Sequence, residues 1–329
     1  MEDMNRRARM LGVLLPVAVS AGLLLIVYRR VDPGALVTGL GQADPAWTVL
    51  YVLLSFVEPV LRGLRWSLLI GTRSPGTAIR GLFISKAGNN LLPLRMGDAV
   101  RAQFVRDRAG IPYSRSAASI LAESILDLVL LGAIVLVFGV FLASRRGMVL
   151  AAVLLAAIPA LALLAMKLPG RLPARIRHSA PLVLFERISG HLKTMYGENG
   201  RNALLASTLA LWALTLSTSY CGLRMFLPSV PFLGVIATIV FVYFSVLIPS
   251  APGFIGTYHA AVAGSLALMG HDLRDYAAAP IAIHLLQFIP QTLAGLALGA
   301  GYLFSNDWGR AWEGLKAARA GLLGGGRST

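Results

Sequence analysis

The sequence predicts an all-α fold, a polytopic membrane helical bundle of about eight crossings with re-entrant or broken helices in its two halves. Of the 329 residues, 56% are hydrophobic and only 14% are charged, whereas soluble proteins carry roughly a quarter charged residues. Apolar runs approach the roughly twenty residues that a crossing needs. Proline and glycine interrupt apolar sequence once in each half of the chain. We therefore predict that residues 1–329 form a single integral membrane domain.

Eight apolar runs are candidates for the crossings, and two of them are short for a span. The second reaches full length only if it continues past its two arginines to Ile70. The segment Gly81–Leu94 is too short to cross and is predicted to be re-entrant. The eight runs are Leu11–Tyr28, Ala46–Leu61, Ala117–Ala143, Met148–Met166, Ala203–Leu223, Phe232–Ile248, Phe254–Met269 and Ala277–Phe304.

The distribution of basic residues predicts the orientation. With eight crossings and a cytoplasmic N-terminus, 24 of the 30 lysine and arginine residues fall in inside segments, as the positive-inside rule requires. We therefore expect both termini in the cytoplasm and the chain in the cell (inner) membrane. The net charge of +15 is then explained by anionic lipid head groups, and no nucleic-acid partner is predicted.

Three segments depart from plain crossings. Residues 81–106 form a first interrupted element, and residues 247–269 form a second. In residues 182–197, apolar side chains recur at helical spacing and charged ones take the other side. This pattern predicts an amphipathic helix at the cytoplasmic interface, although an ordinary surface helix fits it equally well.

The first interruption places polar and basic residues next to Pro93 and Gly97. Open backbone N–H groups, a new helix N-terminus and guanidinium groups together favour an anion. The alternative is that the arginines extend to the interface or pair with the nearby aspartate. The candidate binding residues here are Asn90, Arg95, Asp98 and Arg101.

The second interruption breaks the chain with prolines and glycines before a new helix begins. Broken helices whose N-termini face an anionic group are a known feature of transporter sites. The alternative is a loop between two ordinary spans. The candidate residues are Pro249, Gly253, Gly256, Tyr258 and His259.

Further charged residues lie at helical spacing inside apolar runs. Glu123 and Asp127 are four residues apart, so they share a helix face; we expect counter-charges to arginine and consider a proton pathway less favoured. Arg62 and Arg65 follow Glu58 at the end of the second run and are further head-group candidates, with a structural pair as the alternative. A polar stripe formed by His284, Gln287 and Gln291 suits either a cavity or helix–helix hydrogen bonds.

Catalytic motifs are missing from the sequence. The five histidines have no metal-ligand spacing, and Cys221 has no evident partner. There is no nucleotide-binding P-loop pattern and no G-x-S-x-G. We therefore predict no catalytic residues, no metal, no cofactor and no direct use of ATP.

The order of these motifs resembles the flippase-like transmembrane domain of lysylphosphatidylglycerol synthases and its stand-alone relatives. The resemblance rests on four motifs that together cover most of the chain from about residue 62. They are Arg62-x-x-Arg65-Trp66, Asn90-x-Leu92-Pro93-x-Arg95-x-Gly97-Asp98-x-x-Arg101, Glu123-x-x-x-Asp127 and Pro249-x-x-Pro252-Gly253-x-x-Gly256.

The resemblance implies a domain that translocates phospholipid, polyprenyl-linked lipid or a related amphiphile. Ser124 stands where the family often has arginine, and His259 stands where many members have an acid. Both differences bear on head-group preference. Because the soluble aminoacyl-transferase domain is not part of the sequence, which ends at Thr329, we expect a stand-alone transporter rather than an enzyme that transfers lysine.

We therefore predict a lipid transporter or flippase, not driven by ATP, for an anionic amphiphile whose head group binds between the two interrupted helices. Two alternatives remain open. One is a membrane scaffold that presents lipid to a separate glycosyl- or aminoacyl-transferase partner, and the other is a proton-coupled small-solute transporter. The sequence leaves the lipid, the direction of transport and the formation of a homodimer open.

Overall fold

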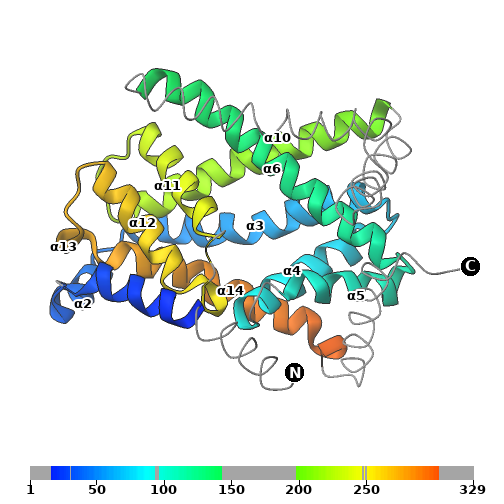
Figure 1. Ribbon diagram of the computed structural model, residues 1–329, viewed down its shortest axis with the longest axis horizontal. Coiled ribbons are helices and arrows are strands. Elements are labelled where there is room, and N and C mark those ends of the chain that lie inside the picture. Colours follow the sequence, from blue (N-terminus) through cyan, green and yellow to red (C-terminus); the bar gives the residue numbers. More distant parts are fainter. Residues whose placement is uncertain are drawn as a thin grey trace, which may run out of the picture. The chain divides into compact units, whose positions relative to one another are not determined.

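A computed structural model describes residues 16–29, 31–92, 96–142, 198–246, 248 and 250–303. These residues form helices joined by short turns, with no strand among them (Figure 1). The all-helical prediction is confirmed. The predicted amphipathic helix at 182–197, the run Met148–Met166 and both termini lie outside the described residues.

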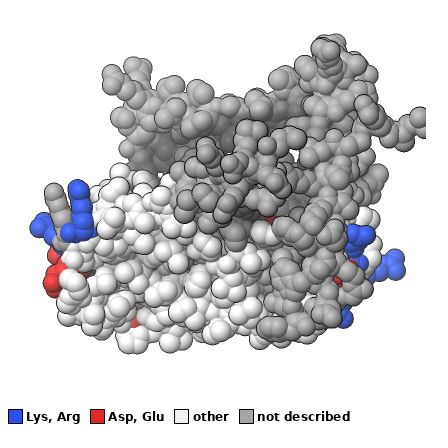
Figure 2. Space-filling view, turned by 60° about the horizontal axis from the view of Figure 1, so that its bottom comes forward, with Lys and Arg blue, Asp and Glu red and all other residues white. Residues whose placement is uncertain are grey.

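Four of the described helices are long and apolar enough to cross a membrane: Pro45–Ile70, Arg115–Val135, Asn202–Arg224 and Leu273–Tyr302. Two shorter apolar helices accompany them, Pro16–Tyr28 and Phe232–Ser245. Figure 2 shows a broad uncharged surface with the described Lys, Arg, Asp and Glu side chains at its edges. The chain is therefore a membrane-embedded helical protein, while eight crossings, the inner membrane and the inside termini stay predictions.

One expected extension is present, and two other elements differ from the expected bounds. The second apolar run continues past its arginines, because α3 spans Pro45–Ile70 and contains Pro59. The element expected to start near Gly81 begins earlier, because α4 spans Pro75–Leu91. The seventh run contains only α12, Thr257–Leu268, whose 12 residues are fewer than the roughly twenty of a full crossing.

The chain divides into two compact units, each assembled from three separate stretches of sequence. Unit 1 comprises Met1–Pro59, Phe83–Asp98 and Trp212–Ala297, and unit 2 comprises Val60–Leu82, Ala99–Leu211 and Leu298–Thr329. The boundaries fall inside α3, α4, α5 (Gly97–Ala109), α10 (Glu198–Arg224) and α14 (Ala278–Leu303).

Unit 1 holds the helices of the second half together with the first part of α3. Its helix α11, Phe232–Ser245, packs directly against α12 (Figure 1). Where α14 crosses the middle of α4, Gly295 lies so close to the carbonyl oxygen of Phe83 that a Cβ atom would collide with it. Small residues at such crossings let two helix backbones approach closely. The short helices α2, Pro33–Gly41, and α13, Leu273–Tyr276, complete this unit.

Unit 2 is built from the second part of α3, the start of α4, most of α5 and all of α6, Tyr113–Leu142. Gly63 on α3 lies against the backbone of Ile79 on α4, so these two helices also approach closely. Trp66, which is fully buried, and Phe104, which is nearly so, lie at the centre of its core. This packing surrounds the charged residues described next.

Candidate head-group site

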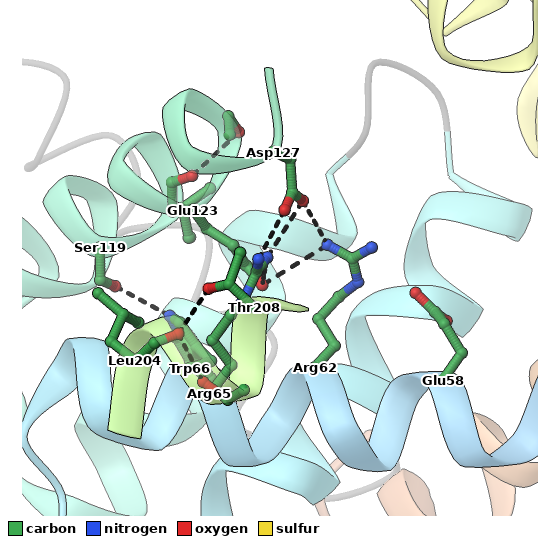
Figure 3. A network of polar contacts seen from close by, with 12 residues as sticks. Glu58, Arg62, Arg65, Trp66, Ser119, Glu123, Asp127, Leu204 and Thr208 are labelled. Atoms are coloured by element: carbon green, nitrogen blue, oxygen red, sulfur yellow. Dashed lines mark hydrogen bonds and ion pairs between the residues drawn. The ribbon is translucent and has the colours of Figure 1, made fainter. Parts of the chain in front are cut away.

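Five charged side chains form a compact cluster inside unit 2, and Figure 3 shows Arg62, Arg65, Glu123 and Asp127. Arg62 and Arg65 lie three residues apart on α3, and Glu123 and Asp127 lie four apart on α6. These spacings put each pair on one helix face, and the packing of α3 against α6 turns the two faces toward each other. Arg101 on α5 is the fifth member.

Arg65 and Asp127 form the centre of the cluster. Nη1 of Arg65 lies 2.6 Å from Oδ1 of Asp127, and Nη2 lies 3.1 Å from Oδ2. The side chain of Arg65 has no solvent exposure. A two-pronged pair of this kind matches the planar guanidinium to the planar carboxylate and fixes both orientations.

Glu123 connects the other arginines to this centre. Its Oε1 accepts from Nη2 of Arg65 at 3.2 Å, and its Oε2 accepts from Nη2 of Arg101, also at 3.2 Å. Nη1 of Arg62 lies 2.8 Å from Oδ2 of Asp127 and 3.7 Å from Oε1 of Glu123. The two carboxylates therefore hold all three guanidinium groups in a single network.

Trp66 supports the network from the same helix as Arg65. The guanidinium carbon of Arg101 lies over the indole ring, 4.7 Å from its centroid. The indole Nε1 donates to Oγ of Ser119 on α6 at 2.9 Å. Cation–π contact and hydrogen bonding thus fix Arg101 and the tryptophan together.

The cluster carries more positive than negative charge. Three arginines and two carboxylates sum to a formal charge of +1, and four of the five side chains are almost fully buried. Arg62 is the most accessible member, with 18% of its side chain exposed. Arg62 is therefore the member of the cluster that a group from outside the chain reaches most easily.

At the first interruption, in unit 1, the start of α5 lies close against the backbone of α4. The helix α4 ends at Leu91 and α5 begins at Gly97, where a Cβ atom would collide with the carbonyl oxygen of Ser85. Oγ of Ser85 donates to Oδ1 of Asp98 at 2.9 Å. Arg95 lies outside the described residues, so its predicted role stays a prediction.

The second interruption is conformationally unusual. Gly253 has φ of 72° and Gly256 has φ of 90°, and between them Phe254 adopts a φ of 57°. A bulky residue at positive φ is a strained exception that its surroundings must hold in place. The helix α12 then begins at Thr257. Pro249 lies outside the described residues.

The two interruptions come together inside unit 1. A Cβ atom on Gly253 would lie 3.3 Å from the carbonyl oxygen of Asn90 and 2.5 Å from the ring of Phe288. The amide nitrogen of Asn90 in turn donates to Oγ1 of Thr292 on α14 at 2.7 Å. The end of α4 therefore packs directly against the break that precedes α12.

Tyr258 and His259 enter an aromatic group with α14. The ring of Tyr258 stacks on that of His284, with centroids 4.7 Å apart. The ring of His259 meets His284 edge-on at 4.9 Å and Tyr28 edge-on at 6.3 Å. Nδ1 of His259 accepts from the backbone N–H of Gly256 at 3.2 Å, which ties the ring to the helix N-terminus as one half of a capping box.

The predicted site residues thus fall into two groups. Arg62, Arg65, Arg101, Glu123 and Asp127 form the charge cluster of unit 2. Asn90, Asp98, Gly253, Gly256, Tyr258 and His259 lie in unit 1 around the two interruptions. Arg101 pairs with Glu123, and Asp98 accepts from Ser85.

Several residues of unit 1 were not singled out from the sequence. Nζ of Lys86 on α4 lies 3.0 Å from Oε2 of Glu58 on α3. Tyr28 and Arg29 line a cavity together with His259 and His284. A tyrosine and an arginine at the end of an apolar run are ordinary interfacial anchors, so sequence alone offers little signal for them.

Gln291 of the polar stripe donates to the carbonyl oxygen of Ser55 at 2.7 Å, a helix–helix contact.

Comparison with known proteins adds two findings. The family model described as the lysylphosphatidylglycerol synthase TM region matches residues 13–295. The protein named glycosyltransferase AglD from Haloferax volcanii is 36% identical over 142 residues, which is 40% of this chain and 23% of that protein. The chain therefore matches less than a quarter of the length of this curated relative.

Proposed function

Because the chain belongs to the lysylphosphatidylglycerol synthase transmembrane-region family, we propose that it moves an anionic membrane lipid between leaflets without ATP. The observation that carries the proposal is the buried cluster of three arginines and two carboxylates, in which Arg62 stays partly accessible. The lipid class is a phospholipid or a polyprenyl-linked lipid, whose phosphate can accept hydrogen bonds from the guanidinium group of Arg62. Its hydrocarbon chains stay in the bilayer.

The three arginines differ in burial, and we assign their roles on that basis. Arg65 is fully enclosed and donates two hydrogen bonds to Asp127. We therefore assign it a positioning role rather than direct contact with the lipid. Arg62 is the most exposed of the three arginines and makes the first contact with the phosphate. Arg101 is held by Glu123 and Trp66 and contributes positive potential. We assign the counter-charges to Glu123 and Asp127.

The test is a lipid-scrambling assay on the full chain in proteoliposomes. A fluorescent phosphatidylglycerol is placed in both leaflets, and a membrane-impermeant reductant bleaches the outer one. Transport is seen as bleaching of the probe that began in the inner leaflet. Arg62→Ala should slow this phase, whereas Arg274→Ala, which removes an arginine from an exposed pair with Asp272, should leave it unchanged. Equal rates for wild type, both variants and protein-free vesicles would exclude transport of this lipid.

A second function has one specific observation in its favour. The relative from Haloferax volcanii is named a glycosyltransferase, which suits a membrane scaffold that presents a lipid to a separate glycosyl- or aminoacyl-transferase. This alternative predicts lipid binding that depends on Arg62 without any scrambling. The same vesicles therefore separate the two functions when binding and bleaching are measured together.

A further inference from the structure

Unit 1 contains a cavity of about 540 Å³, within the range of about 300–1,000 Å³ typical of ligand sites. It lies between the N-terminal helix Pro16–Tyr28, the segment that opens α12 and the middle of α14. Most of its wall is hydrocarbon. The apolar lining residues are Leu24, Leu25, Ile255, Ile281, Leu285 and Phe288.

The remaining lining residues are polar, and two of them have unused hydrogen-bonding capacity. The hydroxyl of Tyr28 and Nδ1 of His284 are buried and have no hydrogen-bond partner in the described structure. His284 is 7% exposed. Buried polar atoms are nearly always paired in folded proteins, so two such atoms lining one cavity point to a polar group that enters from outside the chain.

Charge complements this polar part of the cavity. Arg29 also lines it and is exposed at the end of the N-terminal helix. An arginine that follows an apolar helix lies at the level of lipid head groups. His259 uses Nδ1 to accept from Gly256, so the hydrogen of its neutral ring is on Nε2. The polar residues therefore offer a positive charge and hydrogen-bond donors, which suit an anionic group rich in acceptor oxygens.

The apolar part is accessible from the surface of the bundle. Leu25, Ile255 and Leu285 line the cavity, yet 68%, 40% and 42% of their respective surfaces are exposed. In a membrane-embedded chain such exposed leucine and isoleucine side chains face hydrocarbon. The apolar side of the cavity is therefore open to hydrocarbon chains of the bilayer.

We propose that this cavity binds one acyl chain of an anionic phospholipid, with the phosphate beside Arg29 and its oxygens, or those of the ester, facing Tyr28 and the two histidines. The inference concerns binding at residues of unit 1, and it stands whether or not the charge cluster of unit 2 supports transport. The proposal also assigns a role to the second interruption, because the turn after Phe254 places Ile255 and His259 in the cavity wall.

The test uses the full-length protein in nanodiscs of phosphatidylcholine that contain a phosphatidylglycerol probe with a photoreactive group on one acyl chain. After irradiation, peptide mass spectrometry locates the adducts. We expect them on the peptides that contain Leu24–Arg29 and Ile281–Phe288. Leu285→Trp fills the cavity and should reduce these adducts by about tenfold, the loss that corresponds to ~1.4 kcal/mol of binding.

Leu293→Trp is the matched control, because Leu293 lies on the same helix, is 61% exposed and does not line the cavity. It should keep wild-type labelling. Arg29→Ala should remove the preference for the phosphatidylglycerol probe over a phosphatidylcholine probe with the same photoreactive chain. Adducts that are equal in Leu285→Trp and Leu293→Trp would overturn the site, and an unchanged head-group preference in Arg29→Ala would overturn the assignment of an anionic lipid. A free fatty acid probe that labels these peptides as strongly as the phospholipid would likewise overturn the phosphate assignment.

Discussion

Arg65 and Asp127 lie 62 residues apart in the sequence and meet through two hydrogen bonds of 2.6 and 3.1 Å, in a position where no part of the arginine side chain reaches solvent. The pair joins α3 to α6. If either partner is removed, the other loses its two-pronged contact and keeps one oppositely charged neighbour, Arg62 for Asp127 or Glu123 for Arg65. Substitutions in this pair therefore provide a reference for the loss of stability expected when a structural charge is removed.

Removing Arg65 should destabilise the protein strongly. Arg65→Ala removes the two-pronged partner of Asp127 and one partner of Glu123, so we expect a loss of about 3–5 kcal/mol in unfolding free energy, as for breaking a buried ion pair. Thermal unfolding in detergent measures this as a large fall in Tm. The double variant Arg65→Ala with Asp127→Ala should lose less than the sum of the single variants, because the contact between the two side chains can be lost only once. Strict additivity would show that the two groups do not form one unit.

Substitution of Arg62 should weaken lipid binding more than it lowers the stability of the fold. A charge-assisted hydrogen bond contributes about 1.5–3 kcal/mol, so Arg62→Ala should weaken binding of an anionic lipid by about tenfold or more and shift Tm far less than Arg65→Ala. Binding of phosphatidylglycerol to the purified variant measures the effect. Arg62→Lys should restore most of the charge but not the planar fork. A variant that unfolds like Arg65→Ala would place Arg62 among the structural residues instead.

The glycine at the second interruption should tolerate no side chain. Gly253→Ala combines a positive φ with a Cβ atom 2.5 Å from the ring of Phe288. Gly270 has a similar φ of 84° but no atom within 4 Å of its Cβ position. Gly270→Ala therefore reports the backbone strain alone, about 1–2 kcal/mol, and Gly253→Ala should exceed it in thermal unfolding. Equal losses would mean that Phe288 moves aside without cost.

The membrane topology can be tested independently of the described structure. Eight crossings with both termini inside place Arg145 and Arg175 on opposite sides of the membrane. In a background without Cys221, single cysteines at these positions should react with an impermeant reagent from opposite sides. Reaction from the same side would remove the crossing between them and leave the positive-inside distribution weaker.

The sequence by itself determined the membrane class of the protein, its all-helical character and the position of both interruptions. These are local properties: hydropathy over some twenty residues marks a span, and proline or glycine marks a break. It likewise identified Arg62, Arg65, Glu123 and Asp127 as charged residues in apolar surroundings that would need partners. The extension of α3 through its arginines to Ile70 was recognisable as an alternative for the same local reason.

Only the tertiary structure decided which of these residues meet. Ser85 donates to Asp98 from thirteen residues before it, and Arg101 pairs with Glu123, twenty-two residues away. The cavity between Tyr28, His259 and His284 likewise joins three segments that no local pattern connects. Helix packing determines these contacts. Which side chains share an interface depends on how two helices cross, and spacing along one helix does not specify that crossing.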